Sequence, residues 1–340
     1  MFKMQSQLQQ PTIAVLGDGG WGTTLMLHLA QKGYRVRLWG AFPEYVAFLD
    51  KRRENIKFLP TIKIPPDIPI VADMGQALAG VEVVVVAIPA QFMRNVLRQA
   101  HPHVTKDVVV VSAAKGIEKD TNLRMSEVIR HELPVERVAV LSGPSVAYEV
   151  ARRQPASVVI ASEERLLADE LQPLLSSPTF RVYTTTDLIG VELGGALKNP
   201  IAIAAGISDG LGLGSNAKAA LVTRGMVEIA RLGVALGAKA ETFWGLSGLG
   251  DLLTTCVSGR NRWLGEELGK GRRLEEILRK TEMVIEGVET SHGALALGAK
   301  HQVELPIIQQ VHAILFEGKA PAAAMQELMT RPPKHEYAIT

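Results

Sequence analysis

The sequence predicts an α/β chain in which an N-terminal, mostly parallel sheet is followed by an all-helical C-terminal domain. In the first half, β-branched runs alternate with segments of helical periodicity, which is typical of parallel strands joined by crossover helices. Several of these runs are apolar throughout, as expected for strands that are covered on both faces. Beyond Asp187 the β-branched runs stop, and Ala, Leu, Gly and Glu recur at helical spacing. We therefore expect a sheet domain over 1–187 and a helical domain over 188–340.

The individual strands are predicted from short β-branched runs bounded by glycine, proline or polar residues. They are "TIAVLG" (12–17), "YRVRLW" (34–39), "VEVVVVAI" (81–88), "DVVVVSA" (107–113), "RVAVLSG" (137–143), "SVVIAS" (157–162) and "FRVYTT" (180–185). In the second half, "NAKAALVTRGMVEIARLGVALG" (216–237) is the clearest helical segment.

Composition indicates a soluble globular protein with no overall attraction for nucleic acid or membranes. The 340 residues are 47% hydrophobic and 21% charged, and 37 basic residues nearly balance 35 acidic ones to give a net charge of +2. Because no global field favours an anionic partner, binding of an anion has to be local. A small-molecule ligand is therefore expected rather than nucleic acid.

The single cysteine, Cys256, excludes an internal disulfide and a cysteine-rich metal site. The N-terminal "MFKMQSQLQQ" has no apolar core and is expected to be a disordered lead-in rather than an export signal. The longest apolar run, "VVVVAIPA" (83–90), is far shorter than the roughly 18 residues of a membrane span. These features predict a cytoplasmic protein without a membrane span.

The segment "TIAVLGDGGWGTTLMLHLAQKG" indicates a dinucleotide-binding loop. Gly17, Gly19 and Gly22 have G-x-G-x-x-G spacing between a predicted strand and a predicted helix. The first glycine permits the tight turn, the second permits approach of the backbone to a pyrophosphate, and the third permits close packing of helix and strand. The helix N-terminus then offers unpaired N–H groups to the phosphates. The domain over 1–187 is thus expected to bind a dinucleotide.

The sequence leaves the choice between NAD and NADP open. NAD-selective sites place Asp or Glu at the end of the second strand, where it bonds the ribose hydroxyls. Here that end reads "LWGAFPE", with Gly40 and Ala41 at the expected position and Glu44 further on. No arginine follows immediately to hold a 2′-phosphate. The expected cofactor is therefore written NAD(P).

Polar residues at the ends of later strands are candidate ligand contacts, because open α/β sheets bind ligands outside the carboxyl ends of their strands. Pro89 lies in "AIPAQ" (87–91), where small residues suit a backbone beneath a flat cofactor ring. Lys115 follows another strand in "SAAKGIE" (112–118), although an ordinary solvated lysine is the alternative. "SGPSVAYEVA" (142–151) offers backbone N–H groups and Ser145 to an oxygen-rich ligand, with an ordinary turn as its alternative.

Lys198 is the candidate general base. It lies in "ELGGALKNPIAIAAG", a helical stretch of small and apolar residues, directly before Asn199 and Pro200. Burial of the amine lowers its pKa, and a second cation such as Lys115 would lower it further. A lysine shifted towards neutrality can remove the hydroxyl proton when a hydride leaves the adjacent carbon. The alternative is a helix lysine whose amine reaches solvent.

Further downstream, "FWGLSGLGDLLTTCVSGRNRWLGEELG" (243–269) supplies complementary groups. Asp251 and Thr255 are four residues apart and share a helical face. Arg260 and Asn261 follow a Ser-Gly break, and a guanidinium is well suited to bind a phosphate through two hydrogen bonds. Together with Lys198, these residues suit a small phosphorylated alcohol as substrate.

Other catalytic chemistries find little support in the sequence. No metal site is expected, because the eight histidines are scattered and "HPH" (101–103) has no third ligand near it. Cys256 has no evident histidine partner and is expected to be buried packing rather than a nucleophile.

The motifs together resemble the NAD(P)-dependent glycerol-3-phosphate dehydrogenases over residues 11 to 331. The resemblance is carried by "GDGGWGTTL", "NIKFLPTIKIP", "AIPAQ", "KGIE", "LSGPSVAYEVA", "ELGGALKNPIAIAAGISDGLGLGSNAKAALVTRGMVEI", "GLSGLGDLLTTCVSGRNR" and "VIEGVETS". It implies a Rossmann-like domain followed by a helical domain, and reversible oxidation of glycerol 3-phosphate to dihydroxyacetone phosphate. It further implies supply of glycerol 3-phosphate for phospholipid synthesis, and a homodimer.

The resemblance also implies roles for single residues. Lys198 is implied as the proton acceptor, with Lys115 and Asp251 as further catalytic residues. Implied substrate contacts are Lys115, Gly143, Ser145, Lys198, Asp251, Arg260 and Asn261, with Asn199 and Thr255 as supporting polar groups. Implied cofactor contacts are Gly17, Gly19, Gly20, Trp21, Gly22, Pro89, Lys115, Ala147, Arg260, Val284 and Glu286.

Two other functions stay open at this point. A 3-hydroxyacid or 6-phosphogluconate dehydrogenase also uses a lysine on a helical second domain, but the Arg260-Asn261 pair beside "GLGDL" favours glycerol 3-phosphate. A non-catalytic NAD(P) sensor would retain the glycine-rich loop, yet it would not need Lys115, Lys198 and Asp251 together.

Overall fold

The computed structural model describes residues 10–333, 335 and 336. The predicted N-terminal lead-in lies outside the described residues except for Gln10. The chain forms two compact units. The first consists of Met1–Ala114 and Met125–Leu188, and the second of Lys115–Arg124 and Ile189–Thr340. No sequence signal anticipated that the short segment Lys115–Arg124 packs with the second unit.

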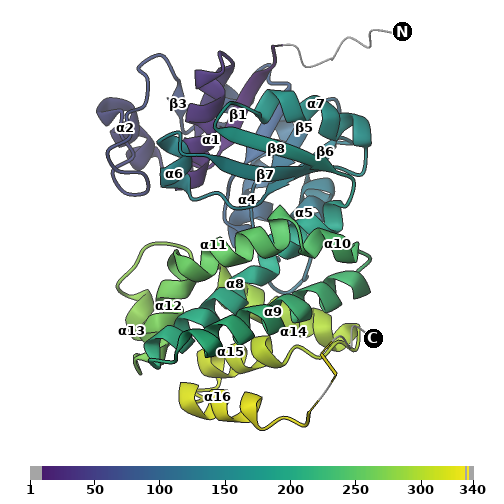
Figure 1. Cartoon of the computed structure of the whole chain (residues 1–340). Coiled ribbons are helices and arrows are strands. Elements are labelled where there is room, and N and C mark those ends of the chain that lie inside the picture. Colours follow the sequence, from purple (N-terminus) through teal and green to yellow (C-terminus); the bar gives the residue numbers. More distant parts are fainter. Residues whose placement is uncertain (1–9, 334, 337–340) are drawn as a thin grey trace. The chain divides into compact units, whose positions relative to one another are not determined.

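The first unit is built on one eight-stranded sheet with the order β3-β2-β1-β4-β5-β6-β7-β8 (Figure 1). All neighbouring strands are parallel except β6 and β7, which are antiparallel. The strands are β1 (Thr12–Leu16), β2 (Arg35–Trp39), β3 (Ile70–Val71), β4 (Val83–Val86), β5 (Val109–Ser112), β6 (Val138–Ser142), β7 (Ala156–Ala161) and β8 (Phe180–Thr185). The predicted mostly parallel sheet is confirmed. The two-residue β3 was not predicted, because so short a strand has no periodicity of its own.

Helices follow most strands of this sheet, as a parallel arrangement requires. They are α1 (Gly20–Gln31), α2 (Pro43–Arg52), α3 (Met74–Leu78), α4 (Ala90–Ala100), the 3₁₀ turn η1 (His101–His103), α5 (Met125–Glu132), α6 (Ala147–Ala151) and α7 (Arg165–Leu175). The fully buried β4, which reads Val83–Val86, shows why the central strands are apolar throughout. The strand order reverses at β1 and β4, which places the glycine-rich loop after β1 at the switch point of the sheet.

The second unit is helical, as predicted. Its helices are α8 (Leu188–Gly210, whose first residue belongs to the first unit), α9 (Ser215–Ala235), α10 (Ala240–Phe243), the π-helical turn η2 (Leu246–Gly250), α11 (Asp251–Val257), α12 (Arg260–Gly269), α13 (Leu274–Leu278), α14 (Glu286–Lys300), α15 (Pro306–Phe316) and α16 (Pro321–Met329). Apolar side chains from α8, α9, α11, α12, α14 and α15 form one core.

The central helix of this unit, α8, is long and apolar enough to cross a membrane, but 94% of its most apolar window is buried inside the protein. It continues through Pro200, which has no N–H to donate to the preceding turn. A helix that is apolar on all sides is expected where other helices surround it. Its polar residues are therefore exceptions, and four of them, Glu192, Lys198, Asn199 and Ser208, are buried.

Candidate active site

Two lysines and one aspartate form the polar centre of the second unit. The Lys198 Nζ lies 2.5 Å from the Asp251 Oδ1, and the Lys115 Nζ donates to the Asp251 Oδ2 at 2.7 Å. Lys198 also donates to the Thr255 hydroxyl at 2.7 Å, and this hydroxyl in turn donates to the carbonyl of Asp251 at 2.7 Å. The structure thus brings together four residues predicted from three separate parts of the sequence.

Burial shifts the protonation of Lys198 within this cluster. Lys198 is 5% exposed and Asp251 is 2% exposed. Loss of hydration lowers the pKa of Lys198 to about 7, because the charged amine is disfavoured in the apolar interior. The Asp251 carboxylate opposes this shift, whereas the Lys115 cation adds to it. Lys198 can therefore exchange a proton near neutral pH, as a general base must.

Two buried asparagines connect this centre to three other segments. The Asn199 amide donates to the Lys115 carbonyl at 3.2 Å, and its side-chain oxygen accepts from the Asn261 amide at 2.9 Å. The Asn261 side-chain oxygen accepts from the Gly287 N–H, also at 2.9 Å, at the start of α14. Both amides thus hold the Lys115 segment, α8, α12 and α14 in a fixed arrangement.

Arg260 is the first residue of α12 and directly precedes Asn261. Its side chain is exposed, and the Nη1 donates to the Val284 carbonyl at 2.9 Å. The preceding Gly259 has a φ of +110°, a conformation that residues with side chains rarely adopt. The predicted cofactor contacts Arg260 and Val284 are therefore neighbours, with Glu286 two residues beyond Val284.

Backbone contact with α8 positions α12. A Cβ on Gly206 would lie 2.0 Å from the carbonyl oxygen of Arg262, and a Cβ on Gly265 would lie 2.0 Å from that of Ile203. Gly210 and Gly269 repeat this arrangement one turn further along. The small residues therefore allow the two helices to touch, which places Asn261 beside Asn199.

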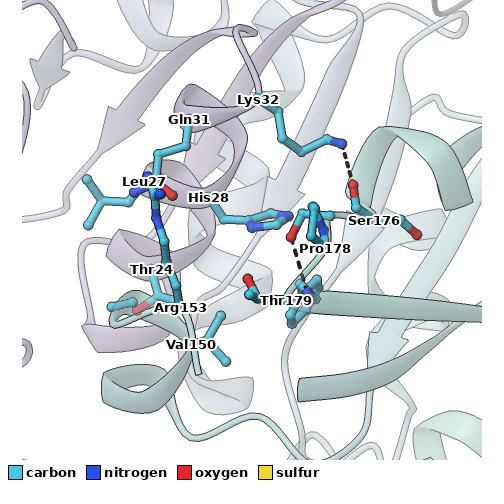
Figure 2. Close-up of a pocket in the computed structure, with 13 residues that line it drawn as sticks. Thr24, Leu27, His28, Gln31, Lys32, Val150, Arg153, Ser176, Pro178 and Thr179 are labelled. Carbon is cyan, nitrogen blue, oxygen red and sulfur yellow. Dashed lines mark hydrogen bonds between the residues drawn. The ribbon is translucent and has the colours of Figure 1, made fainter. Parts of the chain in front are cut away.

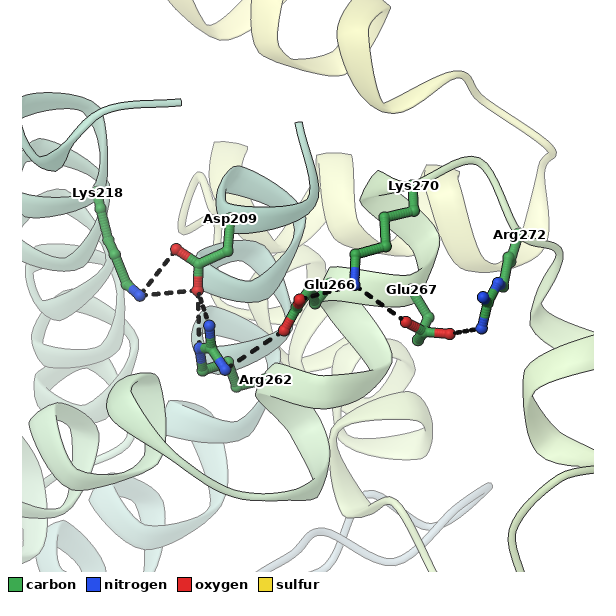
Figure 3. A network of polar contacts seen from close by, with 7 residues as sticks. All are labelled: Asp209, Lys218, Arg262, Glu266, Glu267, Lys270 and Arg272. Carbon is green, nitrogen blue, oxygen red and sulfur yellow. Dashed lines mark hydrogen bonds and ion pairs between the residues drawn. The ribbon is translucent and has the colours of Figure 1, made fainter. Parts of the chain in front are cut away.

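A network of ion pairs also connects α8 and α12 (Figure 3). The Asp209 carboxylate of α8 accepts from the Nε and Nη2 of Arg262, each at 2.7 Å, and from Lys218 of α9 at 2.8 Å. Arg262 follows Asn261 directly. The network continues along α12 through Glu266, Lys270, Glu267 and Arg272.

The glycine-rich loop of the first unit has the shape that a pyrophosphate requires. Gly17 has a φ of +117°, and a Cβ there would lie 2.6 Å from the Ala87 carbonyl oxygen. A Cβ on Gly22 would lie 1.9 Å from the Gly17 carbonyl oxygen, whereas nothing lies within 4 Å of one on Gly19. The space over Gly19 is thus open, and no side chain caps α1. Its first-turn N–H groups remain for an anionic ligand, so the loop fits a dinucleotide.

Other predicted contacts of the first unit follow its strands. Ala147 lies close to the loop, because the Thr24 hydroxyl is 2.8 Å from the Gly20 carbonyl oxygen and 3.1 Å from that of Ala147. Pro89 precedes α4, after β4. After β6, the Ser145 hydroxyl donates to the Gly143 carbonyl at 2.8 Å.

Sequence reasoning missed a polar cluster beside this loop. The Asn55 amide donates to the Asp18 carbonyl and to the Thr23 hydroxyl, both at 2.8 Å, and the Tyr45 hydroxyl donates to the Asn55 side-chain oxygen at 2.6 Å. Asn55 is fully buried. Asn55 opens the motif "NIKFLPTIKIP", which carries part of the family resemblance, but no role for this residue was predicted from the sequence.

A cavity of about 320 Å³ lies beside the C-terminal half of α1 (Figure 2). Its walls include His28 and Lys32 of α1, Arg153, and the segment Ser176–Phe180 before and at the start of β8. His28 and Lys32 bond the carbonyl oxygens of Leu175 and Ser176 at the end of α7. None of the residues predicted for the active site lines this cavity.

A cysteine nucleophile and a metal centre find no supporting arrangement within the part of the chain that the structure describes. Cys256 is buried, and burial raises the pKa of its thiol to about 12. No group of three or more His, Cys, Asp or Glu side chains among the described residues is placed to hold a metal ion.

Comparison with known proteins assigns both halves of the chain to one family. The family models described as "NAD-dependent glycerol-3-phosphate dehydrogenase N-terminus" and "C-terminus" match residues 12–168 and 187–326. A curated relative, the glycerol-3-phosphate dehydrogenase [NAD(P)+] of Moorella thermoacetica, is 49% identical over 327 residues, which cover 96% of this chain and 97% of the relative.

Solved structures agree with this assignment. The structure of the glycerol-3-phosphate dehydrogenase of Coxiella burnetii matches with a TM-score of 0.91 and 41% identity. The match covers 95% of this chain and 99% of the Coxiella chain. The enzyme from Saccharomyces cerevisiae has a TM-score of 0.80 and 26% identity, with 95% and 100% covered. The chain therefore belongs to the NAD-dependent glycerol-3-phosphate dehydrogenase family.

Proposed function

We propose that this chain catalyses reversible hydride transfer between sn-glycerol 3-phosphate and NAD(P)+, giving dihydroxyacetone phosphate and NAD(P)H. The observation that carries the proposal is the buried contact of Lys198 with Asp251 and Thr255, in a chain that matches this family over residues 12–168 and 187–326. A buried lysine with a pKa of about 7 supplies the proton transfer that an alcohol oxidation needs.

In the oxidation direction, neutral Lys198 accepts the hydroxyl proton as the carbon–hydrogen bond on the same carbon breaks and the carbonyl forms. NAD(P)+ bound at the glycine-rich loop would accept the hydride, and in the reverse direction protonated Lys198 returns the proton to the oxygen. Asp251 holds the amines of Lys198 and Lys115 on its two oxygens. This contact supports a role for Lys115 in stabilising negative charge on the reacting oxygen.

The remaining substrate contacts are assigned by chemistry. The exposed Arg260 at the start of α12 binds the phosphate, because its planar guanidinium can donate two parallel hydrogen bonds. Thr255 and Asn199 keep the two lysine segments in place, and Asn261 holds Asn199, through the contacts described above. Gly143 and Ser145 supply further polar contacts to the substrate.

For the cofactor, the open loop Gly17–Gly22 holds the pyrophosphate on backbone N–H groups. The further contacts that we assign to the cofactor are Trp21, Pro89, Ala147, Lys115, Arg260, Val284 and Glu286.

Three wider properties belong to the same proposal: supply of glycerol 3-phosphate for phospholipids, a cytoplasmic location, and a homodimer. Size-exclusion chromatography with light scattering tests the last of these.

The decisive experiment is an assay of the purified chain with dihydroxyacetone phosphate and each reduced cofactor. Oxidation of NADH or NADPH that depends on this substrate is the expected result. Turnover of a 3-hydroxyacid or 6-phosphogluconate instead would replace the substrate, and cofactor binding without any turnover would indicate a sensor.

A further inference from the structure

The carboxylate of Asp18 lies at the end of the neighbouring strand β2. In the β1–β2 pair, Leu16 lies opposite Trp39, so the residues that follow β1 lie beside those that follow β2. Gly40, the residue after β2, has no side chain, and a Cβ built there would lie 2.4 Å from the Asp18 Oδ2. Asp18 thus fills the space that a side chain at the end of β2 would otherwise occupy.

This carboxylate lacks a hydrogen-bond donor on one side. The Asp18 Oδ2 is buried and has no partner among the described residues, although the residue as a whole is part-exposed. Nearby donors serve other acceptors, because the Asn55 amide bonds the Asp18 carbonyl and the Thr23 hydroxyl. Burial raises the pKa of Asp18. A ligand that donates a hydrogen bond would compensate this unfavourable environment.

We infer that Asp18 determines cofactor specificity: its carboxylate accepts a hydrogen bond from the ribose hydroxyls of NAD(H) and repels the 2′-phosphate of NADP(H). In many dinucleotide-binding folds an acidic residue at the end of the second strand has this role. Here the acid comes from the end of the first strand, beside a glycine at the usual position. The inference rests on the proposed binding of the cofactor at the glycine-rich loop.

The cation that acts on Asp18 is Lys57, whose positive charge lowers the pKa of this carboxylate against the larger effect of burial. A free amine here would attract a 2′-phosphate and favour NADP(H). The Lys57 amine, however, lies over the rings of Tyr45 and Phe58, 5.9 and 5.2 Å from their centroids. The residue after Gly40 is Ala41, which offers no charge of its own. The charge of Asp18 therefore outweighs that of Lys57 at this position, and NAD(H) is preferred.

The test measures dissociation constants of NADH and NADPH by fluorescence titration, without substrate. The wild-type chain is expected to bind NADH at least about tenfold more tightly than NADPH, because the 2′-phosphate of NADPH would place a second negative charge beside the Asp18 carboxylate. Asp18→Asn should reduce this ratio by about the same factor, mainly through tighter binding of NADPH. Asp18→Ser provides a smaller replacement if the asparagine variant does not fold.

Glu44→Gln is the matched control, because Glu44 is exposed in the first turn of α2 and is the other acid near the end of β2. It should leave the ratio unchanged. Tighter binding of NADPH by the wild type, an unchanged ratio in both Asp18 variants, or an equal shift in Glu44→Gln would each overturn the inference. Gly19→Val tests the loop itself: if it binds both nucleotides like the wild type, the proposed cofactor site fails, whatever the ratio in Asp18→Asn.

Discussion

The Lys198 Nζ lies 2.5 Å from the Asp251 Oδ1, and both side chains are almost completely buried. Because the second oxygen of the same carboxylate binds Lys115 at 2.7 Å, one negative charge serves two cations. The cluster therefore carries a net positive charge when both amines are protonated. Burial and, to a smaller extent, the Lys115 cation favour loss of the Lys198 proton, which is why this lysine can act as a base in so apolar a helix.

Lys198→Met should abolish most of the turnover and leave cofactor binding intact. The methionine has a similar volume, so the helix packing is retained while the proton acceptor is lost. We expect kcat to fall by about 10²–10⁴-fold, the usual contribution of general acid–base catalysis. Steady-state kinetics and an NADH titration measure the two effects. Near-normal kcat would remove Lys198 from the proton transfer.

The pH dependence of catalysis should follow Lys198. In the oxidation direction the amine must be neutral, so the rate is expected to rise as pH increases through about 7. In the reduction direction the protonated amine is required, and the rate should fall over the same range. Rates of both directions, measured from about pH 5.5 to about pH 9, test this dependence. Parallel profiles in the two directions would contradict the assignment.

Arg260→Lys should weaken binding of the phosphorylated substrate. A lysine keeps the charge but loses the planar pair of donors, so we expect KM for dihydroxyacetone phosphate to rise by about tenfold, with a smaller effect on kcat. Arg272→Lys, further along in the segment after α12, is the control and should leave KM unchanged. Equal KM values in both variants would argue against a phosphate contact at Arg260.

Glu228→Gln should change how stability depends on pH. Glu228 is buried in α9 and accepts the N–H groups of Ile307 and Ile308 at 2.8 and 3.2 Å, and burial raises its pKa to about 7. From its ordinary value of 4.5 up to about 7, the unfolded chain loses this proton while the folded chain keeps it. Glu228 therefore makes the folded state less stable as pH rises through this window.

The glutamine cannot ionise, so the decline in stability between these two pH values should be smaller in Glu228→Gln than in the wild type. Thermal unfolding at a series of pH values provides the comparison. The side-chain oxygen of the glutamine can still accept a hydrogen bond from the N–H groups of Ile307 and Ile308, which limits the loss of stability at low pH. Identical slopes in both proteins would show that Glu228 does not titrate in this window.

Gly206→Ala should destabilise the second unit strongly. The new Cβ would lie 2.0 Å from the Arg262 carbonyl oxygen, so α8 and α12 would have to separate. Overpacking of this kind typically costs about 1–3 kcal/mol. Gly214→Ala is the matched control, since nothing lies within 4 Å of its Cβ. Chemical denaturation distinguishes the two, and equal stability would refute close contact of the helices.

The fold was largely predictable from the sequence, because its signals are local. Apolar β-branched runs such as Val83–Val86 identify buried strands, and the Gly17–Gly22 spacing identifies a loop that binds phosphate. Residue chemistry also indicated Lys198, Asp251 and Arg260 as candidates. Each of these signals lies within about ten residues of chain, where spacing reflects helix or strand geometry directly.

Only the tertiary structure decided which distant groups meet. Lys115 and Asp251 are 136 positions apart, yet they share a hydrogen bond in the helical unit. Likewise, the Asp18 carboxylate reaches the end of β2 because β1 and β2 pair in parallel at a particular register. Such contacts depend on how whole elements pack. Periodicity specifies which face of an element is buried, but not which side chain of another element lies against it.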